Sequence, residues 1–276
     1  MENKKFFDEY IENIIKEKAK ENKKYENFSK YIISRTKDHI EEMWKIYNKY
    51  APKRFKEKMI FSKECFYQRW WEMYLGTKLL EYGLDISTNI GDKGPDFKVS
   101  INGEVYWIEA VAPELGQENS KDKLPEMENG VYSLPREKFL LRISNAIDNK
   151  IKKFDRYLKN GLVKKEDKLI IAISTCNLSQ YGSLMDFPTL AIDSLVYNKG
   201  VLSINLITNE KKIKEQNGII KHNGQKIETD IFKKINCNIS GIIYTNDEPL
   251  NIYDKIYLRQ NENYILKEEF IKVFLN

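Results

Sequence analysis

The sequence predicts an α/β fold with a helical N-terminal extension and a β-rich C-terminal part. Two observations predict it. The pattern of the middle of the chain predicts a helix, a strand, a two-stranded hairpin, a helix and a strand. The N-terminal flank has the spacing of helices, whereas the C-terminal flank favours strands. The 276 residues are 41% hydrophobic, which is enough for a substantial core. We expect one domain with elaborated ends, divided into residues 1–61, 62–175 and 176–276, the last part packed on the core.

The first fifty residues have the spacing of amphipathic helices. A second helical run extends from Tyr31 to Tyr47, and Pro52 marks its end. The first run has apolar residues at i, i+3, i+4 and i+7: Phe7, Tyr10, Ile11, Ile14 and Ile15. The sequence leaves open whether these helices pack on the rest of the chain or on a second copy of it.

The core is expected to begin with a helix that is apolar around most of its circumference and stops at Gly83. Asn102-Gly103 is the strongest short signal for a two-residue type I′ hairpin, and it joins the two strands of the core. The expected elements are a helix, a short extended piece, a Gly-rich turn and these two strands: residues 64–82, 84–87, 91–95, 96–101 and 104–112.

A long polar loop over residues 114–134 precedes a strong helix over 135–158. The fully apolar run 169–173 then predicts a buried strand. Further strands are expected at 201–207, 239–244 and 255–258, the last pairing with 264–266, and the charged segments 211–214 and 221–226 are expected to be solvated connectors.

The composition excludes several classes of protein. No stretch approaches the ~20 apolar residues of a membrane-spanning helix, and we expect a soluble, cytoplasmic protein. Cys65, Cys176 and Cys237 are isolated, and His39 and His222 are the only histidines, so any metal would use oxygen ligands. The 46 Lys+Arg against 41 Asp+Glu give a charge of +5, which is compatible with a nucleic-acid partner without requiring one.

Three carboxylates lie where chemistry is expected. Glu72 lies on a largely apolar helix face, where a salt-bridged or solvated residue is the alternative. Asp96 opens a strand, where a turn-capping role is the alternative. Glu109 interrupts a strand that is apolar on both faces, where an unpaired carboxylate would be unfavourable. Because a tight hairpin joins their strands, Asp96 and Glu109 can converge on a divalent cation.

Taken in order, three short motifs resemble the PD-(D/E)XK nuclease superfamily: Trp71-Glu72-Met73-Tyr74-Leu75, Gly94-Pro95-Asp96-Phe97 and Trp107-Ile108-Glu109-Ala110-Val111. The resemblance covers about residues 62–175. It implies the restriction-endonuclease-like fold, a central mixed sheet flanked by helices. It also implies a Mg²⁺ site, with Mn²⁺ as a substitute, held by Asp96, Glu109 and the Ala110 carbonyl, with Glu72 contributing directly or through water.

The sequence departs from this family at Val111, where the third motif usually has lysine. Lys150 is the best replacement because it falls inside the apolar arc of the helix 135–158, and the alternative is a snorkelling side chain. If it replaces the motif lysine, its nitrogen should lie within about 4–6 Å of Asp96 or Glu109. Three further residues are expected to contact substrate: Gln68, Arg142 and Lys153.

The resemblance implies a Mg²⁺-dependent endonuclease that hydrolyses DNA phosphodiester bonds, in restriction-modification or another form of genome defence. One alternative is a nuclease-fold nucleic-acid-binding protein that has lost catalysis, for which Val111 argues. Another is a nuclease acting on RNA or on repair structures. Cutting both strands of a symmetric site needs two active sites, so we expect a homodimer or a larger assembly. The C-terminal part and the loop 114–134 are expected to help read or clamp DNA.

Overall fold

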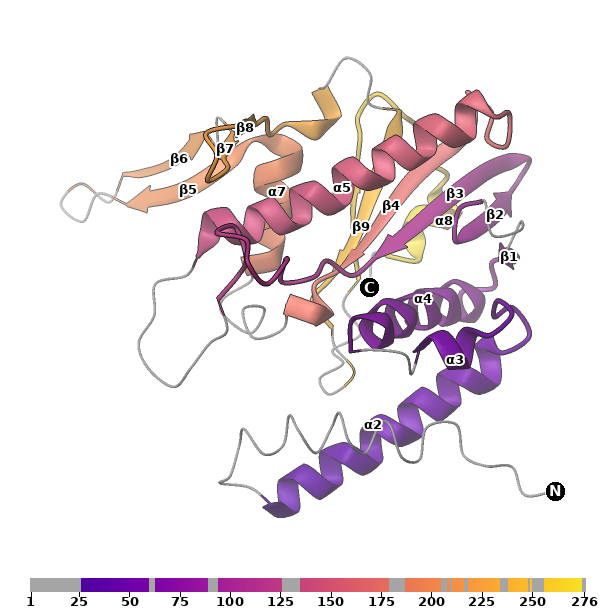
Figure 1. Ribbon diagram of the computed structural model, residues 1–276. Helices are drawn as coiled ribbons and strands as arrows, with labels where there is room; N and C mark the ends of the chain where they lie inside the picture. The colour runs from indigo at the N-terminus through magenta and orange to yellow at the C-terminus, as the bar shows by residue number, and fades with distance from the viewer. Residues whose placement is uncertain are drawn as a thin grey trace.

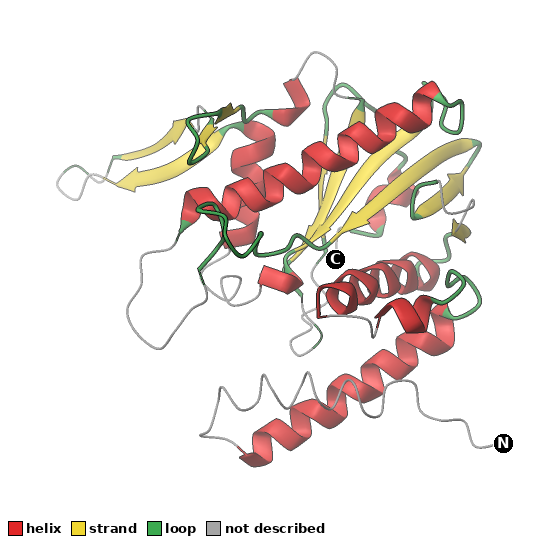
Figure 2. Ribbon diagram, in the orientation of Figure 1, coloured by secondary structure: helices red, strands yellow, loops and turns green. Residues whose placement is uncertain are grey.

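A six-stranded mixed sheet lies at the centre of the computed structural model, with helices on both faces (Figures 1 and 2). The predicted N-terminal helix around residues 7–15 lies outside the described part of the chain, as do 126–134 of the predicted loop and 205–207 of a predicted strand. The structure describes residues 26–59, 63–88, 94–125, 135–178, 187–204, 208, 210–215, 218–233, 238–247, 249 and 256–274.

The sheet has the strand order β1-β2-β3-β4-β9-β10. The central neighbours β3, β4 and β9 are parallel, and the flanking pairs are antiparallel. The type I′ hairpin is confirmed, since Asn102 and Gly103 both have positive φ, 48° and 83°. The strands are β1 (Ile86–Thr88), β2 (Phe97–Ile101), β3 (Glu104–Val111), β4 (Lys168–Ser174), β9 (Ile239–Thr245) and β10 (Tyr257–Gln260).

Two buried clusters cover the two faces of this sheet. One packs α2 (Glu26–Tyr47), α3 (Phe55–Met59), α4 (Lys63–Glu81) and α8 (Glu268–Lys272) on one face. The other packs α5 (Arg136–Lys159) and α7 (Phe187–Tyr197) on the opposite face, and α5 is the crossover between the parallel strands β3 and β4. None of the helices that the structure describes is long and apolar enough to cross a membrane.

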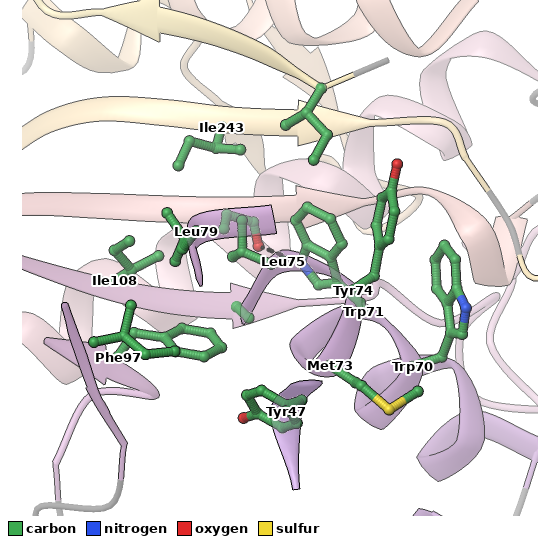
Figure 3. Close-up of a cluster of buried hydrophobic side chains, with 14 of the residues drawn as sticks. Tyr47, Trp70, Trp71, Met73, Tyr74, Leu75, Leu79, Phe97, Ile108 and Ile243 are labelled. Carbon is green, nitrogen blue, oxygen red and sulfur yellow. Dashed lines mark hydrogen bonds between the residues drawn. The ribbon is translucent and has the colours of Figure 1, made fainter. Parts of the chain in front are cut away.

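The helix α4 is buried around most of its circumference, as its sequence predicts. Trp70, Trp71 and Tyr74 are fully buried, and Figure 3 shows their rings among side chains from the sheet. The helix ends in a Schellman motif, in which Leu84 N donates to Leu79 O and Gly83 N to Leu80 O. Gly83 has φ 76°, the left-handed conformation that this motif requires.

Two expectations for the C-terminal part are wrong, and one is confirmed. Residues 211–214, expected to be a connector, belong to the strand β6 (Lys211–Glu215), which pairs with β5 (Lys199–Ile204). This strand can be highly charged because a two-stranded ribbon lies outside the core, unlike a central strand. The segment 221–226 is confirmed as a solvated connector: it forms the exposed turn between β7 (Ile219–Ile220) and β8 (Lys226–Ile227), a second small pair that only its last residue joins. The strand β10 pairs with β9 rather than with 264–266, where Tyr264 N instead donates to Asn261 O in a turn.

The prediction that the C-terminal part is rich in strands also missed the helix α7. The β-branched residues Thr189, Ile192 and Val196 in α7 argue against helix by propensity, whereas Pro188 lies in the first turn, where proline is tolerated. The helix nevertheless forms because Ala191, Ile192, Leu195 and Val196 are spaced to bury one face against α5 and the sheet. Two short 3-10 helices are also present: η1 (Cys176–Leu178) and η2 (Ile231–Lys233).

Gly76 allows α4 to approach α2 closely, so its replacement tests this packing. A Cβ at Gly76 would clash with the ring of Tyr47 and lie 3.1 Å from Phe97. We expect Gly76→Ala to lower the free energy of unfolding by about 1–3 kcal/mol, as overpacking of a core does. Denaturant unfolding measures this, with the exposed Glu81→Ala as a control expected to change it by less than about 0.5 kcal/mol. Equal stability of both variants would contradict the packing argument.

Candidate functional site

Asp96, Glu109 and Lys150 meet on the sheet face that α5 covers. Asp96 directly precedes β2, and Glu109 follows Ile108, the partner of Phe97, so the hairpin register places both acids at the same point. Lys150 Nζ lies 2.5 Å from Glu109 Oε2 and 3.8 Å from Asp96 Oδ2. The predicted proximity is therefore confirmed, and the alternative of a snorkelling side chain is wrong, since Lys150 is only 8% exposed.

Glu109 is fully buried and accepts hydrogen bonds from three side chains of α5. Lys150 and Lys153 donate to Oε2, at 2.5 and 3.2 Å, and the Tyr157 hydroxyl donates to Oε1 at 2.8 Å. Lys153 was expected to contact substrate, and the structure places it on this carboxylate. Tyr157 was missed, although its position i+7 from Lys150 and i+4 from Lys153 puts all three on one stripe of the helix.

Gln68 and Glu72 approach the site from α4, on the opposite face of the sheet. The Gln68 amide nitrogen donates to Glu72 Oε1 at 2.9 Å and to Ala110 O at 3.2 Å, while its oxygen accepts from Ala112 N at 2.9 Å. Glu72 also forms an ion pair with Arg69. Gln68 was expected to contact substrate, but both ends of its amide are hydrogen-bonded within the protein. They bind backbone groups of β3 and of Ala112 just after it, where β2 is no longer alongside.

Arg142, also expected to contact substrate, lies elsewhere on α5. It is eight residues before Lys150, about 12 Å along a helix axis. A Cβ at Gly116, whose φ is 114°, would clash with the Arg142 guanidinium, so this group packs on the backbone of the loop that follows β3. Its buried Nε has no hydrogen-bond partner among the described residues. The structure therefore brings Arg142 to this loop and not to the two acids.

Asp96 is the acid of this site whose ionised form is disfavoured. Burial, together with the negative charges of Glu72 and Glu109, raises the pKa of Asp96 to about 7, and Lys150 and the Ala110 N–H offset this only in part. Burial lowers the pKa of Lys150, but Asp96 and Glu109 raise it by more, so the ammonium stays charged. Burial and Glu109 raise the pKa of Tyr157, which therefore remains a hydrogen-bond donor.

The donor chemistry of this site suits a hard divalent cation. Asp96, Glu109 and the Ala110 carbonyl are oxygen donors of the kind Mg²⁺ prefers, and a cation there would stabilise the ionised form of Asp96, which burial and the neighbouring acids disfavour. Across the described ranges, no three His, Cys, Asp or Glu side chains are grouped to hold a metal. An ion would therefore rest on the two carboxylates and the carbonyl, which now accepts a hydrogen bond from Gln68.

Comparisons of the chain with family models, with curated proteins and with solved structures found no match. The resemblance to the PD-(D/E)XK nucleases therefore remains a prediction from the sequence motifs. What the structure adds is the mixed α/β architecture and the positions of the side chains around Glu109.

The raised pKa of Asp96 makes a prediction about stability. The folded state binds the Asp96 proton more tightly than an unfolded chain does, so ionising this group destabilises the fold as pH rises from about 4 to about 7. Asp96→Asn keeps an oxygen that can accept the Ala110 N–H but carries no charge. In chelator, we expect this variant to gain on the order of 2 kcal/mol over the wild type above pH 7, and little near pH 4.

Denaturant unfolding at several pH values measures this difference. The exposed Asp85→Asn should give no pH-dependent gain and serves as the control. A gain for Asp96→Asn that is constant with pH, or a wild type that is the more stable protein at high pH, would refute the raised pKa of Asp96.

Proposed function

We propose that this protein is a metal-dependent endonuclease that hydrolyses DNA phosphodiester bonds. The proposal is carried by one observation: Asp96 just before β2, Glu109 on β3 and a buried, charged Lys150 on α5 converge. Two carboxylates with an adjacent ammonium are suited to phosphoryl chemistry, in which negative charge on the phosphate must be offset. The order of motifs along the chain further supports a restriction-endonuclease-like fold.

The position of Lys150 accounts for the missing motif lysine. Val111 and Glu109 are two residues apart on β3 and so face the same side, which α5 covers. A lysine on α5 can therefore reach Glu109 from above this face while Val111 packs as an apolar residue. We assign Lys150 the role of orienting the attacking water and offsetting charge on the phosphate.

The carboxylates Asp96 and Glu109, with the Ala110 carbonyl, would hold the metal. A bound Mg²⁺ would lower the pKa of the attacking water and place positive charge beside the phosphate. Tyr157 and Lys153 would keep Glu109 in place through their hydrogen bonds to its two oxygens. Glu72 is held by Gln68 and Arg69 and would act on the metal ion indirectly, without being one of its main ligands.

We further propose a role in restriction or another form of genome defence, a cytoplasmic location and an assembly of two copies, since double-strand cleavage needs two active sites. A binding protein that has lost catalysis is less favoured. The argument for it was that Val111 stands where the motif lysine would be, and Lys150 supplies an ammonium in its place. A nuclease for RNA or repair structures would use the same site chemistry, and substrate trials separate it from a DNA endonuclease.

Incubation with plasmid and phage DNA, with Mg²⁺ or Mn²⁺ against chelator, tests this proposal. We expect metal-dependent cleavage that Glu109→Gln abolishes and Lys150→Met reduces by about 100-fold or more, because the charge at the reacting phosphate is lost. The matched control is Lys152→Met, an exposed position on the same helix, which should cleave at the wild-type rate.

Glu109→Gln is preferred to Glu109→Ala because it keeps an oxygen for Lys150, which is buried and would otherwise lose its partner. Folded Lys150→Met protein that cleaves at the wild-type rate would overturn its assignment. No cleavage of DNA, RNA or branched substrates by the wild type would overturn the nuclease proposal.

A further inference from the structure

The candidate site is open to solvent on the side of β2. The side chain of Asp96 is 26% exposed, whereas that of Glu109 is only 1% exposed. Among the described residues, the buried cluster beneath α5 includes side chains of β3, β4 and β9 but none of β1 or β2. Figure 1 shows β1 and β2 at the edge of the sheet, beyond α5. A substrate would therefore reach Asp96 across this edge of the sheet.

The face of β2 that continues from Asp96 is polar. Side chains alternate along a strand, so Lys98 and Ser100 lie on this face, and Ser87 joins them because it pairs with Lys98 from β1. Both serines are exposed and Lys98 is half-buried. These residues are here called the open face of β2. The apolar residues of β2 are buried in the cluster on the opposite face: Phe97, Val99 and Ile101.

The side chain of Lys98 lies over the ring of Trp107, its partner on β3. Lys98 Nζ is 5.5 Å from the ring centroid, a distance at which the ring attracts a cation. Trp107 is almost fully buried, and its Nε1 donates to Asp167 Oδ2 at 2.8 Å. The same oxygen accepts from Lys164 N at 2.9 Å, so the ring is tied to the loop before β4. The Lys98 ammonium therefore lies on a fixed support.

The charge of Lys98 is not offset by a carboxylate. Within the part of the chain that the structure describes, Lys98 forms no ion pair, and its contact with Trp107 leaves the charge in place. Lys150 and Lys153, in contrast, both contact Glu109. A lysine that is paired with a buried carboxylate must give up this partner to bind a phosphate, whereas Lys98 gives up nothing.

The spacing of Lys98 from the acids suits the backbone of a nucleic acid. Lys98 is two residues after Asp96, and Trp107 is two residues before Glu109 on the paired strand. Two residues of an antiparallel strand span about 6.8 Å, which is the rise of about two nucleotides in one strand of a duplex. A phosphate held at the acids would therefore place a neighbouring phosphate of the same strand beside Lys98.

We infer that Lys98 binds a backbone phosphate of the DNA strand that is cut, about two nucleotides from the reacting phosphate, with this strand lying along the open face of β2. The inference rests on the proposed nuclease function. A lysine acts on a phosphate as a point charge, so this contact positions the strand without reading its sequence. Lys98 is thus a substrate-binding residue and takes no part in the chemical step.

Fluorescence anisotropy with a labelled duplex, in chelator and over a range of salt concentrations, tests this inference in the full chain. We expect Lys98→Gln to bind about 5–10-fold more weakly near 0.1 M salt, because one phosphate contact is lost. The slope of log Kd against log salt should fall by about 0.9. Lys98→Arg keeps the charge and should bind within about twofold of the wild type.

Lys168→Gln is the matched control. Lys168 is also half-buried, and its Nζ lies 5.9 Å from the centroid of the Tyr264 ring. It lies on the opposite face of the sheet, since Tyr106, its partner on β3, is buried in the cluster on that face. The control therefore removes the same charge and the same kind of ring contact away from the acids. It should change neither Kd by more than about twofold nor the slope.

Cleavage kinetics with Mg²⁺ separate the role of Lys98 from that of Lys150. Because Lys98 would contact a phosphate that does not react, we expect Lys98→Gln to raise KM about 5–10-fold and to change kcat by less than about twofold. A lysine that only supports Trp107 would instead lower the thermal stability of the variant and leave the salt slope unchanged, and that result would overturn the inference.

The remaining outcomes distinguish this inference from the nuclease proposal. If the wild type cleaves DNA and Lys98→Gln matches Lys168→Gln in Kd and slope, the inference is overturned and the nuclease proposal stands. If only Lys98→Gln loses affinity and slope while the wild type cleaves nothing with Mg²⁺ or Mn²⁺, the phosphate contact is supported and the nuclease proposal fails. Equal losses in both variants, or no binding of duplex by the folded wild type, would overturn the inference.

Discussion

The buried ion pair between Lys150 and Glu109 is the interaction on which the site depends. Glu109 is fully buried and Lys150 nearly so, which means that both charges have lost most of their hydration. Such a pair adds little stability over apolar residues of similar volume, while loss of one partner is strongly destabilising. A core that could have been filled with apolar side chains instead holds two charges and the donors Lys153 and Tyr157. Arrangements of this kind are typical of sites that carry out chemistry.

The hairpin register and the point at which β2 begins create the rest of the site. Because β2 begins at Phe97, the ladder of β3 would have unpaired backbone groups at Ala110 and Ala112. The Asp96 carboxylate and the Gln68 amide take these positions, which brings α4 and its Glu72 to the same point as the acids on β2 and β3. The burial of Asp96 and its closeness to Glu72, which together raise its pKa, therefore follow from the point at which β2 begins.

Local patterns in the sequence predict much of this fold and the centre of the site. The Asn102-Gly103 hairpin, the apolar circumference of α4 and the place of Lys150 within the stripe of α5 each depend on spacing within one element. The contact of Gln68 with β3 depends on where β2, in another part of the chain, begins, and no local pattern reports that. The strand β6 and the helix α7 were missed because charge and propensity favour other structures, and pairing or burial overrides them.

The central claim is that Asp96 and Glu109 together hold a divalent cation beside Lys150. Mn²⁺ binding measured by electron paramagnetic resonance, on the wild type and on Asp96→Asn and Glu109→Gln, tests it without requiring a substrate. The account predicts one site in the wild type that either substitution removes or weakens by at least about tenfold, with Asp85→Asn unchanged. Equal Mn²⁺ affinity in all four proteins, or no binding by the folded wild type at neutral pH, would contradict it.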